Sequence, residues 1–354
     1  MANYMIKIIS LVLVYAIIAS GMQMPVQPTD PTPTQPPTLT TVPTTVTEPT
    51  QPPTEPSAPE PEPTPPSAGP LVHAPVWQEP ALSQIKAPKL SADNFFIYDT
   101  AISDYLYINT QASKAIYPAS TTKLFTTYVA LQYLSPEDII KVGKELDYVM
   151  WDASRAGFKK GDRVSVEALV YGALLPSGCD ASYILAAAAG RVILKNKNAT
   201  AKSAINAFMA ECNRMAKELG MKNTNLVTPD GYHEDDHKIS MEGFVTIAQC
   251  CLENKLIKRV IRSSEATISY TNSQGKTCSE DFKNTNLIIH PESKYYHASC
   301  VGLKTGSTND AGYCLLSAYY VDGRYIIVGI FGCQSSNKRF QDANTLFETY
   351  LPYL

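Results

Sequence analysis

Apolar and polar residues alternate with two different periods beyond about residue 90. Short runs rich in Phe, Ile, Tyr and Val predict strands over 94–98, 105–108, 301–305, 313–321 and 325–332. The last two meet at Asp322-Gly323, which is typical of a hairpin turn. Apolar residues at helical spacing predict helices over 120–133, 165–175, 180–190, 204–219, 240–253 and 339–350. This order predicts an α+β fold, in which both ends of the domain build one antiparallel sheet, flanked by helices, and a helical subdomain fills the middle.

A separate apolar run lies near the N-terminus. Residues 8–19 are almost wholly apolar, and Lys7 is the one charged residue in 1–24. The run is shorter than the roughly 20 residues of a membrane span and suits a secretory signal peptide. Ala19-Ser20-Gly21 offers small residues for cleavage, and an uncleaved membrane anchor is the alternative. Either way we expect the rest of the chain to lie outside the cytoplasm, secreted or anchored to the outer face of the membrane.

Proline divides the chain further. The 354 residues include 26 prolines, and 19 of these lie between Pro25 and Pro80. Thr, Gln and Glu fill much of the same segment, which leaves too little apolar surface to offset the entropy of folding. Proline also favours the extended polyproline II conformation. We therefore predict a Pro/Thr-rich disordered stalk over 25–80 and one folded domain over 81–354.

Charge and cysteine content limit the class of protein. The chain has 33 acidic and 30 basic residues, which argues against a nucleic-acid-binding protein because such proteins need a concentrated basic surface. All eight cysteines fall in 81–354 without a CxxC pair. An even number in an exported chain is compatible with disulfides, and free buried thiols are the alternative that the sequence leaves open.

Ser120 and Lys123 are the first candidates for chemistry. They lie at i and i+3 at the start of the predicted helix 120–133, so they share one face. A serine hydroxyl becomes a nucleophile when a neighbouring group takes its proton, and a lysine amine with a lowered pKa can do this. Backbone N–H groups at the start of a helix can also stabilise an oxyanion. Taken alone, the S-x-x-K pattern is weak, because a capping serine followed by a surface lysine looks the same.

Two further motifs strengthen this interpretation. Ser177-Gly-Cys179 lies between two predicted buried helices, and Lys304-Thr305-Gly306 ends a predicted strand. The lysine and threonine could hold a carboxylate, and the glycine lets a substrate lie close to the strand. S-x-x-K, S-D-N and K-T-G occur in this order in β-lactamases and penicillin-binding proteins.

With these motifs the sequence resembles the serine-type D-alanyl-D-alanine carboxypeptidases, the low-molecular-mass penicillin-binding proteins of peptidase family S11. The resemblance runs from about residue 92 to the end and includes segments 219–224, 228–233, 284–287 and 302–315. It implies a β-lactamase/transpeptidase-like fold and a DD-peptidase catalytic domain over 81–354. It also implies that the substrate is a peptidoglycan stem peptide, that β-lactams inhibit covalently, and that no metal or organic cofactor is needed.

The same resemblance implies a role for each matching residue. Ser120 would be the nucleophile that forms the acyl-enzyme, and Lys123 its general base. Ser177 would relay a proton to the leaving D-alanine. The terminal carboxylate would bind to Lys304 and Thr305, next to Gly306, and backbone N–H groups of Ser120 and Ser307 would form the oxyanion hole. Cys179 departs from the family pattern, because an asparagine that contacts substrate usually stands there, and a thiol is a weak hydrogen-bonding group.

His233-Glu-Asp-Asp-His237 matches the H-E-x-x-H zinc signature. That chemistry requires a helix, whereas Pro229-Asp-Gly231 precedes the motif and aspartates are poor helix formers. We therefore expect a polar loop and no metal site.

Two alternatives to a carboxypeptidase remain. A β-lactamase-like hydrolase shares the three motifs, although no E-x-x-L-N stretch follows Ser177 to supply a deacylating glutamate. A non-catalytic cell-wall-binding pseudoenzyme is suggested by Cys179. Any membrane attachment is expected through the N-terminal segment.

Overall fold

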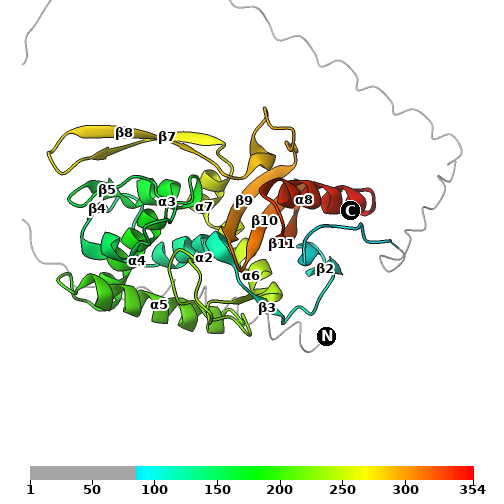
Figure 1. The fold of residues 1–354 in the computed structure, drawn as a ribbon, viewed down its shortest axis with the longest axis horizontal. Coiled ribbons are helices and arrows are strands. Elements are labelled where there is room, and N and C mark those ends of the chain that lie inside the picture. The colour runs from blue at the N-terminus through cyan, green and yellow to red at the C-terminus, as the bar shows by residue number, and fades with distance from the viewer. Residues whose placement is uncertain (1–84) are drawn as a thin grey trace, which may run out of the picture. The chain divides into compact units, whose positions relative to one another are not determined.

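Segments from both ends of the domain build one five-stranded antiparallel sheet in the computed structural model, which describes residues 85–354 (Figure 1). The strand order is β2-β1-β11-β10-β9, and each neighbouring pair is antiparallel. The strands are β1 (Asn94–Asp99), β2 (Asp104–Ile108), β9 (Cys300–Thr308), β10 (Gly312–Val321) and β11 (Arg324–Cys333). The sheet that the sequence predicts from both ends is therefore confirmed, and its strands extend slightly beyond the predicted ones.

Both faces of this sheet are apolar, because side chains alternate between faces along each strand. Helix α8 (Ser336–Tyr350) covers one face, where the rings of Tyr319 and Phe347 stack with centroids 3.9 Å apart. Helix α6 (Met241–Glu253) packs on the other, where Phe244 stacks on Phe331 at 4.3 Å. The sheet is thus the central layer between two helical layers, as the predicted α+β fold requires.

A helical subdomain occupies the middle of the chain (Figure 1). Its helices are α2 (Thr122–Ala130), α3 (Val166–Leu174), α4 (Cys179–Ile193), α5 (Ala201–Glu218) and α7 (Lys255–Ile261). The predicted helix 120–133 is shorter than expected, because its first residues form a 3-10 turn, η2 (Ala119–Thr121). That turn matters for function, since it contains Ser120.

The sequence pattern missed a second sheet and a two-stranded ribbon. The second sheet has the order β4-β5-β7-β8, and the ribbon pairs β3 with β6. Their bounds are β3 (Ala115–Ile116), β4 (Ile139–Lys141), β5 (Arg163–Ser165), β6 (Ile239–Ser240), β7 (Glu265–Thr271) and β8 (Thr277–Lys283). Four of these strands have only two or three residues, too few to show a period. β7 does alternate, with Ala266, Ile268 and Tyr270 packed on the core, but Thr, Ser and Glu between and around them made the pattern weak.

The remaining sequence predictions have different outcomes. All eight cysteines are free thiols and six of them are buried, which favours the free-thiol alternative over disulfides. The predicted export segment 1–24 and stalk 25–80 lie outside the described residues. No helix within residues 85–354 is both long and apolar enough to span a bilayer.

Candidate active site

The hydroxyl of Ser120 and the amine of Lys123 lie in direct contact. Ser120 sits in the turn η2, and Lys123 follows in the first turn of α2. Because the two residues are three positions apart, the turn brings Lys123 Nζ to 2.8 Å from Ser120 Oγ. Lys123 is completely buried, whereas Ser120 lines the cavity described below. The pair is therefore within proton-transfer distance, and its oxygen is open to a substrate.

A second segment fixes the amine of Lys123. The backbone carbonyl of Asp230 accepts a hydrogen bond from Nζ at 2.8 Å. Gly231 has a φ of +76°, and a Cβ there would lie 1.9 Å from the carbonyl oxygen of Ala119. Only glycine lets this turn approach the nucleophile turn so closely. The segment Thr228-Pro-Asp-Gly-Tyr-His233 therefore orients the lysine, a role that the sequence did not reveal.

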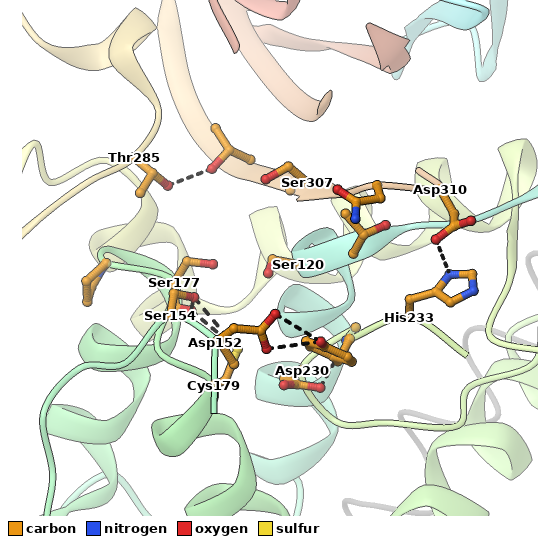
Figure 2. Close-up of a pocket in the computed structure, with 18 of the residues that line it drawn as sticks. Ser120, Asp152, Ser154, Ser177, Cys179, Asp230, His233, Thr285, Ser307 and Asp310 are labelled. Carbon is orange, nitrogen blue, oxygen red and sulfur yellow. Dashed lines mark hydrogen bonds and ion pairs between the residues drawn. The ribbon is translucent and has the colours of Figure 1, made fainter. Parts of the chain in front are cut away.

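The motif Ser177-Gly-Cys179 faces Ser120 across the cavity (Figure 2). Ser177 has a φ of +65°, a strained conformation that functional residues often adopt. Cys179 Sγ lies 3.7 Å from Ser154 Oγ, and its thiol makes no hydrogen bond with Lys123 among the described residues. Burial raises the pKa of the Cys179 thiol, although the charge of Lys123 opposes this. The thiol therefore stays protonated and is a poor nucleophile.

Asp180 holds this motif in place, which the sequence analysis did not anticipate. Its fully buried carboxylate accepts hydrogen bonds from the backbone N–H groups of Ala156 (2.7 Å), Gly157 (2.8 Å) and Phe158 (3.2 Å). These bonds fasten the loop before β5 to the start of α4. That loop contains Ser154, whose hydroxyl donates to the carbonyl of Ser177 at 2.7 Å.

Strand β9 forms the opposite wall and carries Lys304 and Thr305. Lys304 is fully buried, and its amine donates to the carbonyl of Thr305 at 3.1 Å. Burial lowers the pKa of Lys304 well below its usual range, and the nearby charges of Lys123 and Arg339 lower it further. The hydroxyl of Thr305 shares a hydrogen bond of 2.6 Å with that of Thr285. Lys304 and Thr305 thus form a polar end of the cavity where an anion can bind.

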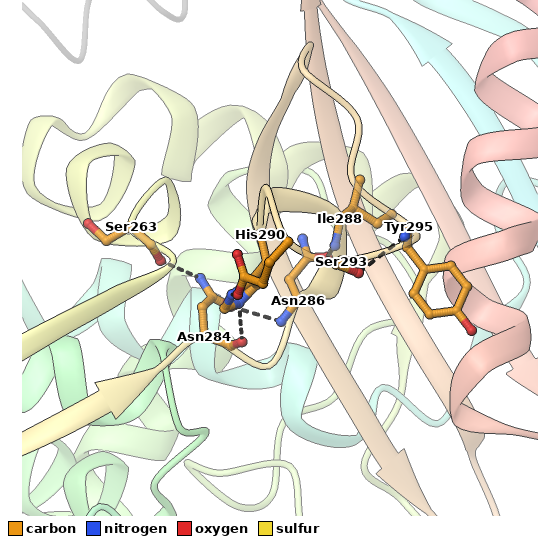
Figure 3. Close-up of polar contacts among 8 residues, drawn as sticks. Ser263, Asn284, Asn286, Ile288, His290, Ser293 and Tyr295 are labelled. Carbon is orange, nitrogen blue, oxygen red and sulfur yellow. Dashed lines mark hydrogen bonds and ion pairs between the residues drawn. The ribbon is translucent and has the colours of Figure 1, made fainter.

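Hydrogen bonds in a tight turn after β8 hold Asn284 and Asn286, the two neighbours of Thr285 (Figure 3). Asn284 Nδ2 donates to the carbonyl of Ser263 at 3.1 Å, and its Oδ1 accepts the backbone N–H of Asn286 at 2.9 Å. His290 Nε2 donates to the carbonyl of Asn284 at 2.7 Å. Both asparagines are buried, so the two residues that flank Thr285 fix its backbone. This accounts physically for the Asn284-Thr-Asn-Leu287 segment.

Gly306 and Arg339 complete this wall. A Cβ on Gly306 would lie 2.9 Å from the backbone nitrogen of Ser120, so the glycine lets β9 pass directly beside the nucleophile. The guanidinium of Arg339, on α8, donates to the carbonyl of Gly306 at 3.1 Å. Arg339 is buried and its Nε has no hydrogen-bond partner among the described residues. Sequence reasoning missed Arg339, because no motif marks it.

These residues surround one cavity of about 590 Å³ (Figure 2). Its lining includes Ser120, Ser177, Cys179, Thr305, Gly306, Ser307 and Arg339. Lys123 and Lys304 lie just behind that lining, where both are fully buried. The structure thus brings all eight residues that the sequence singled out to one place, although the three motifs are far apart along the chain.

The H-E-x-x-H segment does not form a zinc site. Residues 233–236 are a loop rather than a helix. His237 Nδ1 accepts a backbone N–H from Thr228 at 3.1 Å, so the proton lies on Nε2, which donates to Thr122 Oγ1 at 3.0 Å. Both ring nitrogens of His237 are therefore occupied, and burial lowers the pKa of this histidine to about 4.

A serine–lysine pair beside an antiparallel sheet, between that sheet and a helical subdomain, is the arrangement of the β-lactamase/transpeptidase fold. Comparison with known proteins narrows the class. The model of the family "D-alanyl-D-alanine carboxypeptidase" (Peptidase S11) matches residues 82–335. The chain belongs to this family.

Two curated relatives show how similar family members are. The chain is 31% identical over 232 residues to the D-alanyl-D-alanine carboxypeptidase of Streptomyces sp. strain K15. This match covers 64% of this chain and 76% of the relative. It is 26% identical over 237 residues to D-alanyl-D-alanine carboxypeptidase DacF of Bacillus subtilis. That match spans 55% of the length of DacF and 65% of this chain.

Solved structures give the same result for the fold. The crystal structure of the Streptomyces K15 DD-transpeptidase superposes with a TM-score of 0.68 at 27% sequence identity, and covers 76% of this chain and all of that one. Solved variants of that protein replace a serine, the cysteine two residues after it, a further serine and an arginine. The first two have the spacing of Ser177 and Cys179, and the last two have the spacing of Ser307 and Arg339.

Proposed function

We propose that this protein is a serine-type D-Ala-D-Ala carboxypeptidase that removes the terminal D-alanine from peptidoglycan stem peptides. The observation that carries the proposal is the 2.8 Å contact between Ser120 Oγ and Lys123 Nζ, in a cavity whose far wall supplies Lys304 and Thr305. A nucleophile and an anion-binding end in one cavity suit a peptide that ends in a carboxylate. Membership of the carboxypeptidase family supports the same substrate.

In the proposed reaction, Ser120 Oγ attacks the carbonyl carbon between the two terminal D-alanines. Lys123 Nζ takes the hydroxyl proton. The oxyanion forms beside the backbone N–H groups of Ser120 and Ser307, since Gly306 lets the two segments lie in contact. Ser177 passes a proton to the departing amine, and D-alanine leaves. Water then hydrolyses the Ser120 ester and restores the serine.

The terminal carboxylate binds at the positive end of the cavity. Thr305 donates its hydroxyl, the amine of Lys304 lies behind it, and Arg339 supplies positive charge. An arginine is the better partner for a carboxylate, because its planar guanidinium can donate two parallel hydrogen bonds. Arg339 lines the cavity beside Gly306, so its charge lies at this end. An arginine at the same spacing from a serine was replaced in a solved variant of the Streptomyces protein.

Two measurements test the proposal. Benzylpenicillin should add its mass to the intact protein, and the adduct should be absent in Ser120→Ala. D-Alanine should be released from a diacetylated Lys-D-Ala-D-Ala peptide by the wild-type protein but not by Ser120→Ala. Full D-alanine release by Ser120→Ala would show that another residue is the nucleophile. Peptide binding with neither adduct nor release would favour the pseudoenzyme alternative.

The lifetime of the penicillin adduct distinguishes a carboxypeptidase from a β-lactamase. No glutamate lines the cavity within residues 85–354, and a class A β-lactamase needs one to activate the deacylating water. We therefore expect an adduct that persists for many minutes. Rapid regeneration of free enzyme, with hydrolysed penicillin in solution, would favour the β-lactamase alternative.

Transfer of the acyl group to an amine is a second candidate reaction. It is favoured by Cys179, since the Streptomyces relative with a cysteine at the same spacing from a serine is described as a DD-transpeptidase. Adding glycylglycine as an acceptor tests this reaction. Formation of a new amide product, at the expense of hydrolysis, would assign transpeptidation to this protein.

The proposed site of action is outside the cytoplasm, at the cell wall. The apolar run 8–19 and the proline-rich segment 25–80 motivate this proposal. The N-terminal sequence of the protein isolated from culture medium and from membranes tests it. A mature N-terminus near Gly21 in the medium would indicate secretion, whereas an intact N-terminus in the membrane fraction would indicate an anchor. Recovery of all the protein from the cytoplasm would contradict both.

A further inference from the structure

Helix α7 has one strongly basic face. Three basic side chains of α7 and that of its C-cap residue recur at i, i+3, i+4 and i+7, a spacing that places them together on one side: Lys255, Lys258, Arg259 and the C-cap Arg262. The helix buries its other side, which consists of Leu256, Ile257, Val260 and Ile261. Packing of the apolar side against the domain therefore turns all four cations outward.

These four side chains line a hollow of about 420 Å³ at the surface, and no acidic residue contributes to its lining. Arg259 forms an ion pair with Glu167 at 2.5 Å. Within residues 85–354, Lys255, Lys258 and Arg262 have no acidic partner. Three uncompensated positive charges therefore surround one hollow, although acidic and basic residues are nearly balanced in the whole chain.

The basic hollow is separate from the catalytic cavity. None of its four residues lines the cavity around Ser120. Helix α7 nevertheless packs directly on β9, because a Cβ on Gly302 would lie 2.9 Å from Ile261. Because the basic side of α7 faces away from β9, a ligand in the hollow would leave the catalytic cavity open.

We propose that this basic hollow binds a linear phosphate-bearing polymer outside the cell. A polymer with regularly spaced phosphates can contact several of these cations at once, and it gains affinity from the release of its counterions. The two arginines suit phosphate in particular, since a guanidinium can donate two hydrogen bonds to it. The proposal does not depend on the reaction at Ser120.

A membrane surface fits the basic hollow less well. Proteins that lie on a bilayer combine basic residues with apolar side chains that insert between the lipids. The apolar side chains of α7 are all buried. The observations therefore favour a soluble polyanion over an anionic lipid surface.

The test measures binding of the full-length chain to fluorescein-labelled linear polyphosphate by anisotropy, at several salt concentrations. Lys258→Gln/Arg262→Gln removes two unpaired charges of the hollow and keeps a polar side chain at each position. Lys197→Gln/Lys202→Gln is the matched control, because it removes the same charge from exposed positions elsewhere. We expect the first pair to weaken binding about tenfold and to flatten the salt dependence, as expected for lost phosphate contacts. The control pair should change affinity less than twofold.

Thermal melting and the rate of the penicillin adduct serve as checks on folding, and both should be unchanged in the two double variants. Equal loss of binding in both double variants would overturn the proposal, because binding would then depend on net charge alone. Absence of wild-type binding at about 0.15 M salt would also overturn it. A third result would overturn it as well: the protein binds phosphatidylglycerol vesicles through Lys258 and Arg262 but does not bind polyphosphate. That result would assign the basic hollow to a membrane surface.

Discussion

Gly306 and Ser120 approach so closely that a Cβ on the glycine would lie 2.9 Å from the serine backbone nitrogen. The methyl group would also lie 3.0 Å from Ala119 Cβ. Both contacts are with the short turn that carries the nucleophile, so neither can be relieved by rotating a long side chain. The distance between β9 and this turn is therefore set by the absence of a side chain at residue 306.

Gly306→Ala should accordingly push β9 away from Ser120 and separate the two N–H groups of the proposed oxyanion hole. We expect the rate of acylation by penicillin to fall at least about 100-fold, with a loss of about 1–3 kcal/mol in stability from overpacking. Stopped-flow acylation and urea unfolding measure the two effects. Gly275→Ala is the control, because no atom lies near its Cβ position and its positive φ makes it report backbone strain without overpacking. An unchanged acylation rate in Gly306→Ala would mean that this contact does not shape the site.

Cys179 stands where the family pattern has an asparagine, and its effect can be predicted from its contacts. The thiol lies 3.7 Å from Ser154 Oγ and 3.9 Å from the carbonyl of Ser177, whereas Lys123 is held by Ser120 and the carbonyl of Asp230. Since a thiol hydrogen-bonds weakly, Cys179→Ala should change the acylation rate less than about threefold. Ser177→Ala should lower D-alanine release at least about 100-fold, because it removes a proton relay.

Both Cys179 and Ser177 variants can be compared by penicillin acylation and D-alanine release on the same preparations. A loss in Cys179→Ala as large as that in Ser177→Ala would assign the thiol a direct part in the reaction.

The sequence predicted the active-site pair because its geometry is local. Ser120 and Lys123 are three residues apart on one turn, so their contact follows from helical spacing alone. Lys304 and Thr305 were predicted on the correct strand, from the apolar run and the following hairpin, but the prediction ended that strand too early, because β9 continues to Thr308. Prediction succeeded where one secondary-structure element determines which residues meet.

Positions that depend on packing between elements were not predicted. The carbonyl of Asp230 reaches Lys123 from a loop distant in sequence, and Arg339 reaches Gly306 from the last helix. Neither contact has a local period or motif that could reveal it. Asp180 could have been noticed in the sequence, because it is an acidic residue directly after Ser177-Gly-Cys179, at the start of an otherwise apolar predicted helix. Its backbone partners became visible only in the fold.

His237 should make the protein sensitive to acid. Burial is the main cause that lowers the pKa of this histidine to about 4, and the charges of His233 and Lys123 lower it further, while Asp230 opposes them. In the unfolded chain a histidine titrates near pH 6.5. Between these values the unfolded state binds the extra proton, so stability falls as the pH drops from about 6.5 to about 4. The expected loss is about 3 kcal/mol over that range.

Urea unfolding of wild-type and His237→Gln proteins between pH 4 and 7 measures this contribution. The variant should lose less stability on acidification than the wild type, whatever its absolute stability at pH 7. His233→Gln removes one charge that lowers the pKa of His237, so its slope should lie between those of the wild type and His237→Gln. Identical slopes in all three proteins would show that His237 is not the group responsible.

Burial of the Lys304 amine, which the proposed substrate binding requires, should reduce the stability of the fold. The amine is fully buried, and burial lowers its pKa well below the usual range, with further lowering by Lys123 and Arg339. Lys304→Met keeps the volume and removes the amine, so we expect it to raise the free energy of unfolding by about 1–2 kcal/mol at pH 7. The same variant should lose D-alanine release, because the anion-binding end of the cavity is gone.

The pH dependence of stability separates the cost of burying the Lys304 amine from a simple packing change. Between the lowered pKa and the unfolded value near 10.4, the unfolded chain binds one more proton than the folded chain at Lys304. Wild-type stability should therefore rise with pH over that interval, and Lys304→Met should lack this rise. Lys222→Met, at an exposed position, should follow the wild type. A less stable Lys304→Met protein that keeps the wild-type pH dependence would contradict the proposed cost of burying this amine.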